Sequence, residues 1–173
     1  MPCCVLGEKM KVVLIGFAAS YKTTVGSLIA KQLQCSFWDV DSLVEEVAHS
    51  TVSEIFAQQG EKAFRKMEND VLKKLSDVRG VISCGGGSVL AKNFPSFAKN
   101  GKVVWLKTSA NSVKQRLTVG TRPLFDNLSA EQLAQQVEQR EKLYRNFADV
   151  CIVTDDKTSQ QVADETLQFL QLR

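Results

Sequence analysis

A chain of 173 residues with 44% hydrophobic and 24% charged residues has an ordinary globular composition, which excludes a fibrous repeat and a disordered chain. Its net charge of +3 is too small for a general nucleic-acid binder. The chain has 5 cysteines without C-x-x-C spacing and a single histidine, which predicts that it has no zinc finger. It has no long apolar run, so we expect no membrane anchor and a soluble cytoplasmic protein. We expect an N-terminal extension over residues 1–10 and one domain over residues 11–173.

The first predicted strand, residues 11–15, leads into a loop that reads GFAASYKT over residues 16–23. A helix follows, because apolar residues recur at helical spacing from Val25 to Leu33. Strand, loop, Lys-Thr and helix form the context in which G-x-x-x-x-G-K-[ST] binds phosphate, although Tyr21 replaces the second glycine. The loop amides and the helix dipole favour an anion at this position.

A second predicted strand, residues 35–38, ends in Asp39 and Asp41. Both carboxylates lie on one side of an extended chain, which suits metal and hydroxyl chemistry. The structural alternative is helix capping, because Ser42 and Glu45 have the spacing of a capping box. With the phosphate loop upstream we favour the functional interpretation.

Two helix starts follow, one at Thr51-x-x-Glu54 and one at Gly60-Glu61. Apolar residues from Phe64 to Leu75 form the buried stripe of the second helix. Arg65 and Glu68 lie beside that stripe, three residues apart, and taken alone they indicate a surface ion pair of little energetic value.

A third strand, residues 81–84, runs into the triplet Gly85, Gly86 and Gly87. Three glycines allow backbone to approach a ligand closely and expose amide donors, whereas a flexible linker is the alternative. A fourth strand at 102–106 and a helix containing Arg116 precede a loop at 119–127, in which Arg122 could reach over a phosphate; taken alone, such a loop is a turn.

The helix predicted over residues 130–144 places Arg140 on an otherwise apolar stripe. Either a buried carboxylate or an anionic ligand must pair with that guanidinium, and the sequence leaves both open. A fifth strand at 150–153 and a helix from about residue 159 complete the chain. Five strands alternating with helices predict an α/β fold, a parallel sheet with helices on both faces and ligands at the carboxyl ends of its strands.

Together these motifs resemble the shikimate kinase family of P-loop kinases, in the nucleoside-monophosphate-kinase superfamily, over nearly the whole chain. The resemblance rests on the loop at 16–23, FWDVD at 37–41, GEKAFR at 60–65 with Glu68, GGGSV at 85–89, RPL at 122–124 and Arg140-x-x-Leu143-Tyr144. It implies a P-loop kinase fold with a lid loop, and phosphorylation of the shikimate 3-hydroxyl in aromatic amino acid biosynthesis. It also implies ATP and Mg²⁺ as cofactors and a monomer.

The resemblance further implies a role for each matching residue. Lys22, Asp41 and Arg122 would be catalytic, with Lys22 on the β- and γ-phosphates and Arg122 in the lid. Thr23 and Asp39 would hold magnesium. The implied ATP contacts are Ala19, Ser20, Tyr21, Lys22, Thr23, Thr24, Arg116 and Arg122. The implied shikimate contacts are Asp41, Phe56, Phe64, Arg65, Gly85, Gly86, Gly87 and Arg140.

Two positions depart from the family's loop, which usually reads G-x-x-G-x-G-K-[ST]. Ala19 and Tyr21 replace its last two glycines, and enforcing glycine-like backbone angles there costs about 1–2 kcal/mol per residue. We therefore expect ATP binding to be weakened by about one to two decades rather than abolished. Two alternatives stay open, a non-catalytic shikimate binder with impaired nucleotide binding and a kinase for another small hydroxy acid such as gluconate.

Overall fold

The fold is built on a parallel sheet of five strands in the order β2-β3-β1-β4-β5. The computed structural model describes residues 10–117, 125 and 128–171. All four strand pairings are parallel, which confirms the α/β class predicted from the alternation of strands and helices. The strands are β1 Lys11–Ile15, β2 Phe37–Asp39, β3 Gly80–Ser83, β4 Lys102–Lys107 and β5 Val150–Val153.

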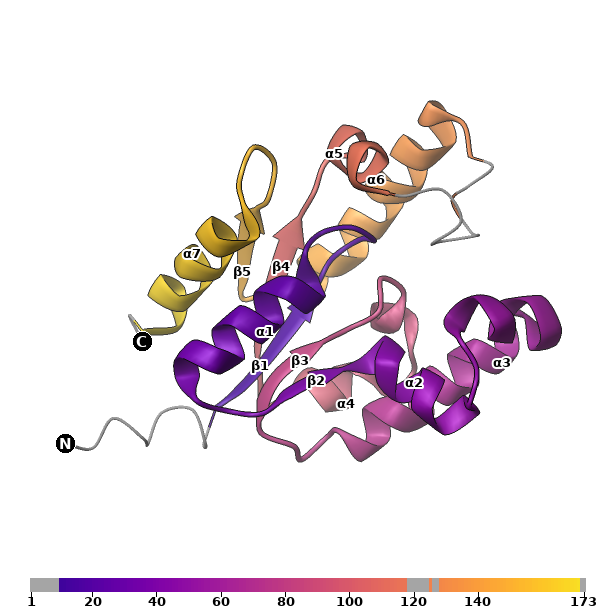
Figure 1. The fold of residues 1–173 in the computed structure, drawn as a ribbon, viewed down its shortest axis with the longest axis horizontal. Helices are drawn as coiled ribbons and strands as arrows, with labels where there is room; N and C mark the ends of the chain where they lie inside the picture. Colours follow the sequence, from indigo (N-terminus) through magenta and orange to yellow (C-terminus); the bar gives the residue numbers. More distant parts are fainter. Residues whose placement is uncertain (1–9, 118–124, 126–127, 172–173) are drawn as a thin grey trace.

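Helices cover both faces of this sheet (Figure 1). Alternate β1 residues point to opposite faces, so Val12 and Leu14 pack with α1 and α7, whereas Val13 and Ile15 pack with α3, α4 and α6. The helices are α1 Lys22–Leu33, α2 Val40–Ala48, α3 Val52–Lys74, η1 Ser88–Leu90, α4 Phe94–Ala98, α5 Ala110–Arg116, α6 Ala130–Phe147 and α7 Ser159–Gln171. Among helices of the described ranges, none is both long and apolar enough to cross a membrane.

Helix α2 begins one residue after β2, and this corrects the predicted start. Asp39 is the N-cap, and its Oδ1 accepts a hydrogen bond from the Ser42 amide at 3.1 Å. Of the structural alternative, the capping box at Ser42 and Glu45 is therefore wrong, because the side chain of Glu45 instead accepts the Val52 amide at 2.9 Å, whereas a helix-capping aspartate is present as Asp39. Asp41 consequently lies in the first turn of α2.

Helix α3 begins as predicted and contains one break. Thr51 and Glu54 form a reciprocal capping box at its start. Gly60 has φ 80° and ψ 171°, which interrupts the helix where the sequence predicts a new helical stretch. Glycine suits this left-handed backbone angle because it has no Cβ.

Lys11 starts β1 and fixes the amino-terminal end of the sheet. It is only 2% exposed, and its Nζ donates to the carbonyl oxygens of Leu75 at 3.2 Å, Ser76 at 2.8 Å and Phe97 at 2.6 Å. These carbonyls follow or end helices, where backbone acceptors lack helical partners. Burial lowers the pKa of Lys11.

The apolar stripe of α6 is narrower than predicted. Leu133, Val137 and Tyr144 are buried, whereas Ala130 and Ala134 face solvent. Small side chains contribute little to a buried face, so the larger residues decide which side of the helix packs on the sheet. Arg140 shares the buried side, as the sequence predicts.

Candidate active site

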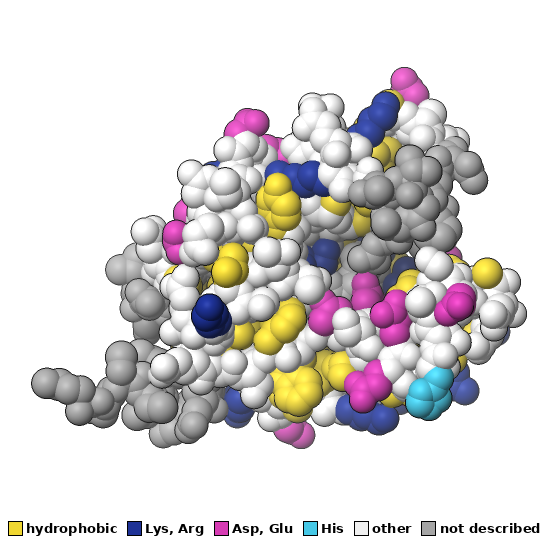
Figure 2. All heavy atoms as spheres, in the orientation of Figure 1, with side chains coloured by type: hydrophobic (Ala, Val, Ile, Leu, Met, Phe, Trp, Pro, Cys, Tyr) yellow, Lys and Arg dark blue, Asp and Glu magenta, His cyan; other side chains and the backbone are white. Residues whose placement is uncertain are grey.

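One cleft opens at the carboxyl ends of β1, β2 and β3, and its lining joins segments far apart in the chain. The phosphate-type loop, the start of α2, the middle of α3, the glycine triplet, α5 and α6 all contribute to it. Figure 2 shows acidic and basic side chains gathered near the middle of this face. The cleft thus brings together every described residue that the sequence predicts for the site.

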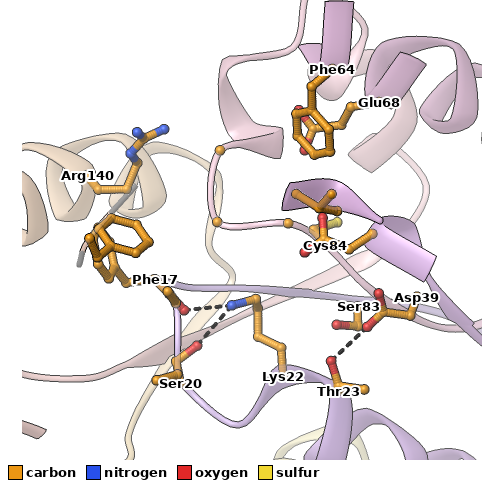
Figure 3. Close-up of a pocket in the computed structure, with 18 of the residues that line it drawn as sticks. Phe17, Ser20, Lys22, Thr23, Asp39, Phe64, Glu68, Ser83, Cys84 and Arg140 are labelled. Carbon is orange, nitrogen blue, oxygen red and sulfur yellow. Dashed lines mark hydrogen bonds between the residues drawn. The ribbon is translucent and has the colours of Figure 1, made fainter. Parts of the chain in front are cut away.

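The loop after β1 adopts the strained backbone expected from its missing glycines. Ala19 has φ 58° and Tyr21 has φ 68°, both in the left-handed region that disfavours side chains. At the loop's end the Nζ of Lys22 donates to the Phe17 carbonyl at 2.6 Å and to the Ser20 hydroxyl at 3.2 Å (Figure 3). The loop is therefore folded around its lysine even without glycine at these positions.

Thr23 and Asp39 meet beside this loop, at the positions predicted for magnesium. The Thr23 hydroxyl donates to Asp39 Oδ2 at 2.7 Å (Figure 3). Both are hard oxygen donors, and Mg²⁺ at phosphate sites is usually held by one or two protein oxygens plus phosphate and water. Within the described ranges, no group of three His, Cys, Asp or Glu side chains could hold a metal ion by itself. The pair fits Mg²⁺ of the phosphate-bound kind.

Glu68 differs from the surface ion pair that its sequence context indicates, because its carboxylate is buried beside the cleft. It is 0% exposed, its Oε2 accepts from Arg65 Nη1 at 2.8 Å and its Oε1 accepts from the Ser88 hydroxyl at 2.6 Å. Although burial alone lowers the pKa of Arg65, the carboxylates of Glu68 and Glu61 raise it overall. One sequence signal was available: Glu68 continues the spacing of Phe64 and Leu72.

The glycine triplet is pressed between other site residues. A Cβ on Gly85 would lie 2.7 Å from Asp41 Oδ1, and a Cβ on Gly87 would collide with the guanidinium of Arg65. Gly86 approaches the phosphate-type loop, because a Cβ there would lie 3.6 Å from the Ala18 amide nitrogen. A side chain at Gly85 or Gly87 would displace Asp41 or Arg65, so close packing, and not a flexible linker, explains glycine at these two positions.

Helix α6 adds Arg140 to the wall of the cleft and places the buried Tyr144 behind it. The Tyr144 hydroxyl donates to the Gly86 carbonyl at 2.6 Å, and burial raises the pKa of this tyrosine. Nη1 of Arg140 is shielded from solvent, and no atom of the described residues accepts a hydrogen bond from it. A buried unpaired guanidinium nitrogen is costly, so this position favours an anionic ligand.

Aromatic rings and a third arginine, Arg116, complete the lining. The rings of Phe56 and Phe64 lie 4.9 Å apart, centroid to centroid, on the α3 side. The guanidinium carbon of Arg116 lies 3.9 Å from the centroid of the Tyr21 ring. Thr24 is exposed at the start of α1 and also lines the cleft. Arg122 lies outside the described residues.

Comparison with known proteins agrees with this arrangement. A family model for shikimate kinase matches residues 18–171. The shikimate kinase of Moorella thermoacetica is 40% identical over 162 residues, 92% of this chain and 93% of that protein. The structure of Acinetobacter baumannii shikimate kinase in complex with shikimate is 30% identical, with a TM-score of 0.91 over 98% of this chain and 97% of that one. Aquifex aeolicus shikimate kinase is 34% identical, with a TM-score of 0.81 over 94% of this chain and 96% of that one. This chain belongs to the shikimate kinase family.

Proposed function

We propose that this protein transfers the γ-phosphoryl group of ATP to the 3-hydroxyl of shikimate, giving shikimate 3-phosphate and ADP. The observation that carries the proposal is Nη1 of Arg140, which is buried in the cleft wall without an acceptor among the described residues. Arg65 lines the same cleft. Two guanidinium groups suit one carboxylate, because their planar N–H groups match its oxygens.

The chemistry follows from what the cleft supplies. The shikimate oxygen attacks the γ-phosphorus, the bond from that phosphorus to the bridging oxygen of ADP breaks, and Asp41 takes the hydroxyl proton. Lys22 would neutralise charge on the transferring group, together with Arg122 in the lid that the family resemblance implies, so positioning and electrostatics provide most of the acceleration. A magnesium ion at Thr23 and Asp39 would add positive charge to the phosphate oxygens.

The shikimate side of the cleft orients the acceptor. Glu68 holds Arg65 at 2.8 Å and Ser88 at 2.6 Å, so the guanidinium that receives the substrate carboxylate is already fixed. Tyr144 holds the Gly86 carbonyl, and the glycine triplet allows backbone amides to approach the substrate. Phe56 and Phe64 bound the space for the ring.

The test is ADP release in a coupled assay at millimolar ATP, with and without shikimate. Replacing Arg140 by Met should raise the shikimate KM by about 10- to 100-fold, the loss of one charged hydrogen-bonding group, and leave the ATP KM unchanged. Arg145→Met is the matched control, because Arg145 is exposed on the same helix. An enzyme without shikimate-dependent ADP release would contradict the proposal.

ADP release and calorimetric titration distinguish the two alternative functions from the proposed one. A gluconate kinase would release ADP with gluconate and not with shikimate. A non-catalytic binder would show heat on shikimate titration and none on ATP titration. The two arginines would suit gluconate as well, but the D-x-D segment at 39–41, the Arg140-x-x-Leu143-Tyr144 segment and the match to the shikimate kinase family model support shikimate.

We also propose a cytoplasmic monomer that requires Mg²⁺. Three cysteines of the described residues, Cys35, Cys84 and Cys151, carry free thiols, as expected in a reducing compartment. The described residues that the resemblance assigns to ATP and shikimate all line this one cleft, which supports a site that one chain can form. Light scattering after gel filtration tests the mass, and chelation by EDTA followed by Mg²⁺ addition tests the metal; a dimer or an EDTA-resistant activity would overturn the respective point.

A further inference from the structure

The two loop residues with strained backbones are both contacted by one side chain, that of Arg116. Its guanidinium stacks on the Tyr21 ring at 3.9 Å, and its Nη1 donates to the Ala19 carbonyl at 3.3 Å. Ala19 and Tyr21 are the positions at which φ is 58° and 68° without glycine. A single arginine therefore contacts both residues whose backbone angles a side chain resists.

Arg116 is itself held by hydrogen bonds to Thr154, the residue that follows β5. Its Nη1 donates to the Thr154 hydroxyl at 3.0 Å and its Nη2 to the Thr154 carbonyl at 2.9 Å. Thr154 is 0% exposed, and its hydroxyl lies 2.6 Å from that of Thr108. The loop is thus tied through Arg116 to the buried ends of β4 and β5 rather than to another exposed loop.

We propose that Arg116 is a positioning residue that holds the phosphate-binding loop in its strained conformation through Tyr21, so that the tyrosine replaces by stacking what a glycine would supply by conformational freedom. The proposal rests on the proposed function, since it concerns the loop that binds ATP. A left-handed backbone at one non-glycine residue costs a factor of about 5 to 30 in the population of that conformation. A cation–π stack recovers a factor of similar size.

A substitution series at Tyr21 separates stacking from strain, with ADP affinity measured by titration calorimetry. Tyr21→Phe keeps the ring and should bind ADP within about twofold of the wild type. Tyr21→Ala loses the ring but keeps the strained backbone, so its ADP affinity should fall about tenfold. Tyr21→Gly loses the ring and the strain together, so its affinity should lie between those of the wild type and the alanine variant. Equal affinity of the alanine and glycine variants would refute a backbone cost at this position.

A double-mutant cycle then tests whether Arg116 acts through Tyr21. Arg116→Met should weaken ADP binding about tenfold in the wild-type background and only about twofold in the Tyr21→Gly background. Lys114→Met is the matched control, because Lys114 is exposed on the same helix and should change neither value. If Arg116 contacted only the adenine base, its substitution would cost the same factor in both backgrounds, and the proposal would be wrong.

Tripolyphosphate, which has no base, provides a second readout. Arg116→Met should raise the inhibition constant of tripolyphosphate against ATP by about the same factor as the ADP dissociation constant. The reason is that the substitution weakens phosphate binding by the loop and not recognition of the adenine base. An unchanged tripolyphosphate constant would assign Arg116 to base recognition instead. Wild-type protein that bound no ADP at all would overturn the proposed function itself, whereas ADP binding with equal factors in the cycle would overturn only the role of Arg116.

Discussion

Replacing Glu68 by Gln tests whether the buried carboxylate orients Arg65, the arginine that we propose binds shikimate. Glu68 is 0% exposed and pairs with Arg65 at 2.8 Å and Ser88 at 2.6 Å. Glutamine preserves the shape and one acceptor oxygen, but it removes the charge and places an amide donor opposite either the guanidinium or the hydroxyl. The variant therefore keeps the volume of the site and loses its charge-assisted hydrogen bonds.

The expected magnitude follows from that contact set. A hydrogen bond to a charged group contributes about 1.5–3 kcal/mol, so the free energy of unfolding should fall by about that amount. The shikimate KM should rise about tenfold, because Arg65 keeps its exposed contact with Glu61 but loses its buried anchor and so samples more rotamers, and the ATP KM should stay near its wild-type value. Urea denaturation measures the first effect and the coupled assay measures the other two.

Glu61→Gln is the matched control for this experiment. Glu61 also contacts Arg65, at 3.2 Å, but its side chain is 60% exposed. Exposed ion pairs contribute about 0–1 kcal/mol, so this variant should change stability and shikimate KM little. If Glu68→Gln behaved like Glu61→Gln in both measurements, the buried carboxylate would have no orienting role.

Three further substitutions test other contacts. Tyr144→Phe leaves the Gly86 carbonyl without its donor at 2.6 Å, and the shikimate KM should rise about fivefold by kinetics, one hydrogen bond's worth; an unchanged KM would contradict it. Lys11→Met removes the donor of two buried carbonyls and one partly buried carbonyl, so urea melts should show about 2–4 kcal/mol less stability with unaltered KM values. Burial lowers the pKa of Lys11 in the folded protein, so at pH values between this lowered pKa and the ordinary lysine pKa the unfolded chain binds more protons than the folded one. The free energy of unfolding of the wild type should therefore rise with pH through this range, and Lys11→Met should lack that rise. Asp39→Asn should raise the Mg²⁺ requirement about tenfold in a metal titration, since one hard anionic ligand is lost, and the same midpoint as wild type would argue against metal binding there.

The sequence predicts which segments form strands better than it predicts which strands lie side by side in the sheet. Hydrophobic periodicity locates β1 and β5 at the residues where the structure has them. It does not give the order β2-β3-β1-β4-β5, because a buried strand shows which residues are apolar and not which strand lies beside it. The site could still be placed, since all carboxyl ends of parallel strands meet at one edge.

The sequence indicates a surface position for Glu68 because one of its two partners is distant in the chain. A carboxylate on a helix is ordinarily solvated, and burial is tolerated only when partners satisfy it. One partner, Arg65, is visible three residues away, but the other, Ser88, is 20 residues distant and joins it only through the fold. Spacing alone shows that Glu68 continues a buried stripe; it does not show what compensates the buried charge.

The two replaced glycines of the loop show the same limit: the sequence reveals the strain but not the distant residue that compensates it. The sequence predicts correctly that Ala19 and Tyr21 adopt backbone angles suited to glycine, because they replace glycines of the phosphate-loop motif. It does not reveal the compensation, since Arg116 lies 97 residues from Ala19 and reaches it from the end of α5. A motif scored residue by residue counts each replacement as a loss. In the folded chain the large side chain that creates the strain also provides the ring on which Arg116 stacks, so the cost and the compensation arise from one substitution. The loss of ATP affinity expected from the sequence should therefore be smaller than about one to two decades, by the factor that the double-mutant cycle measures.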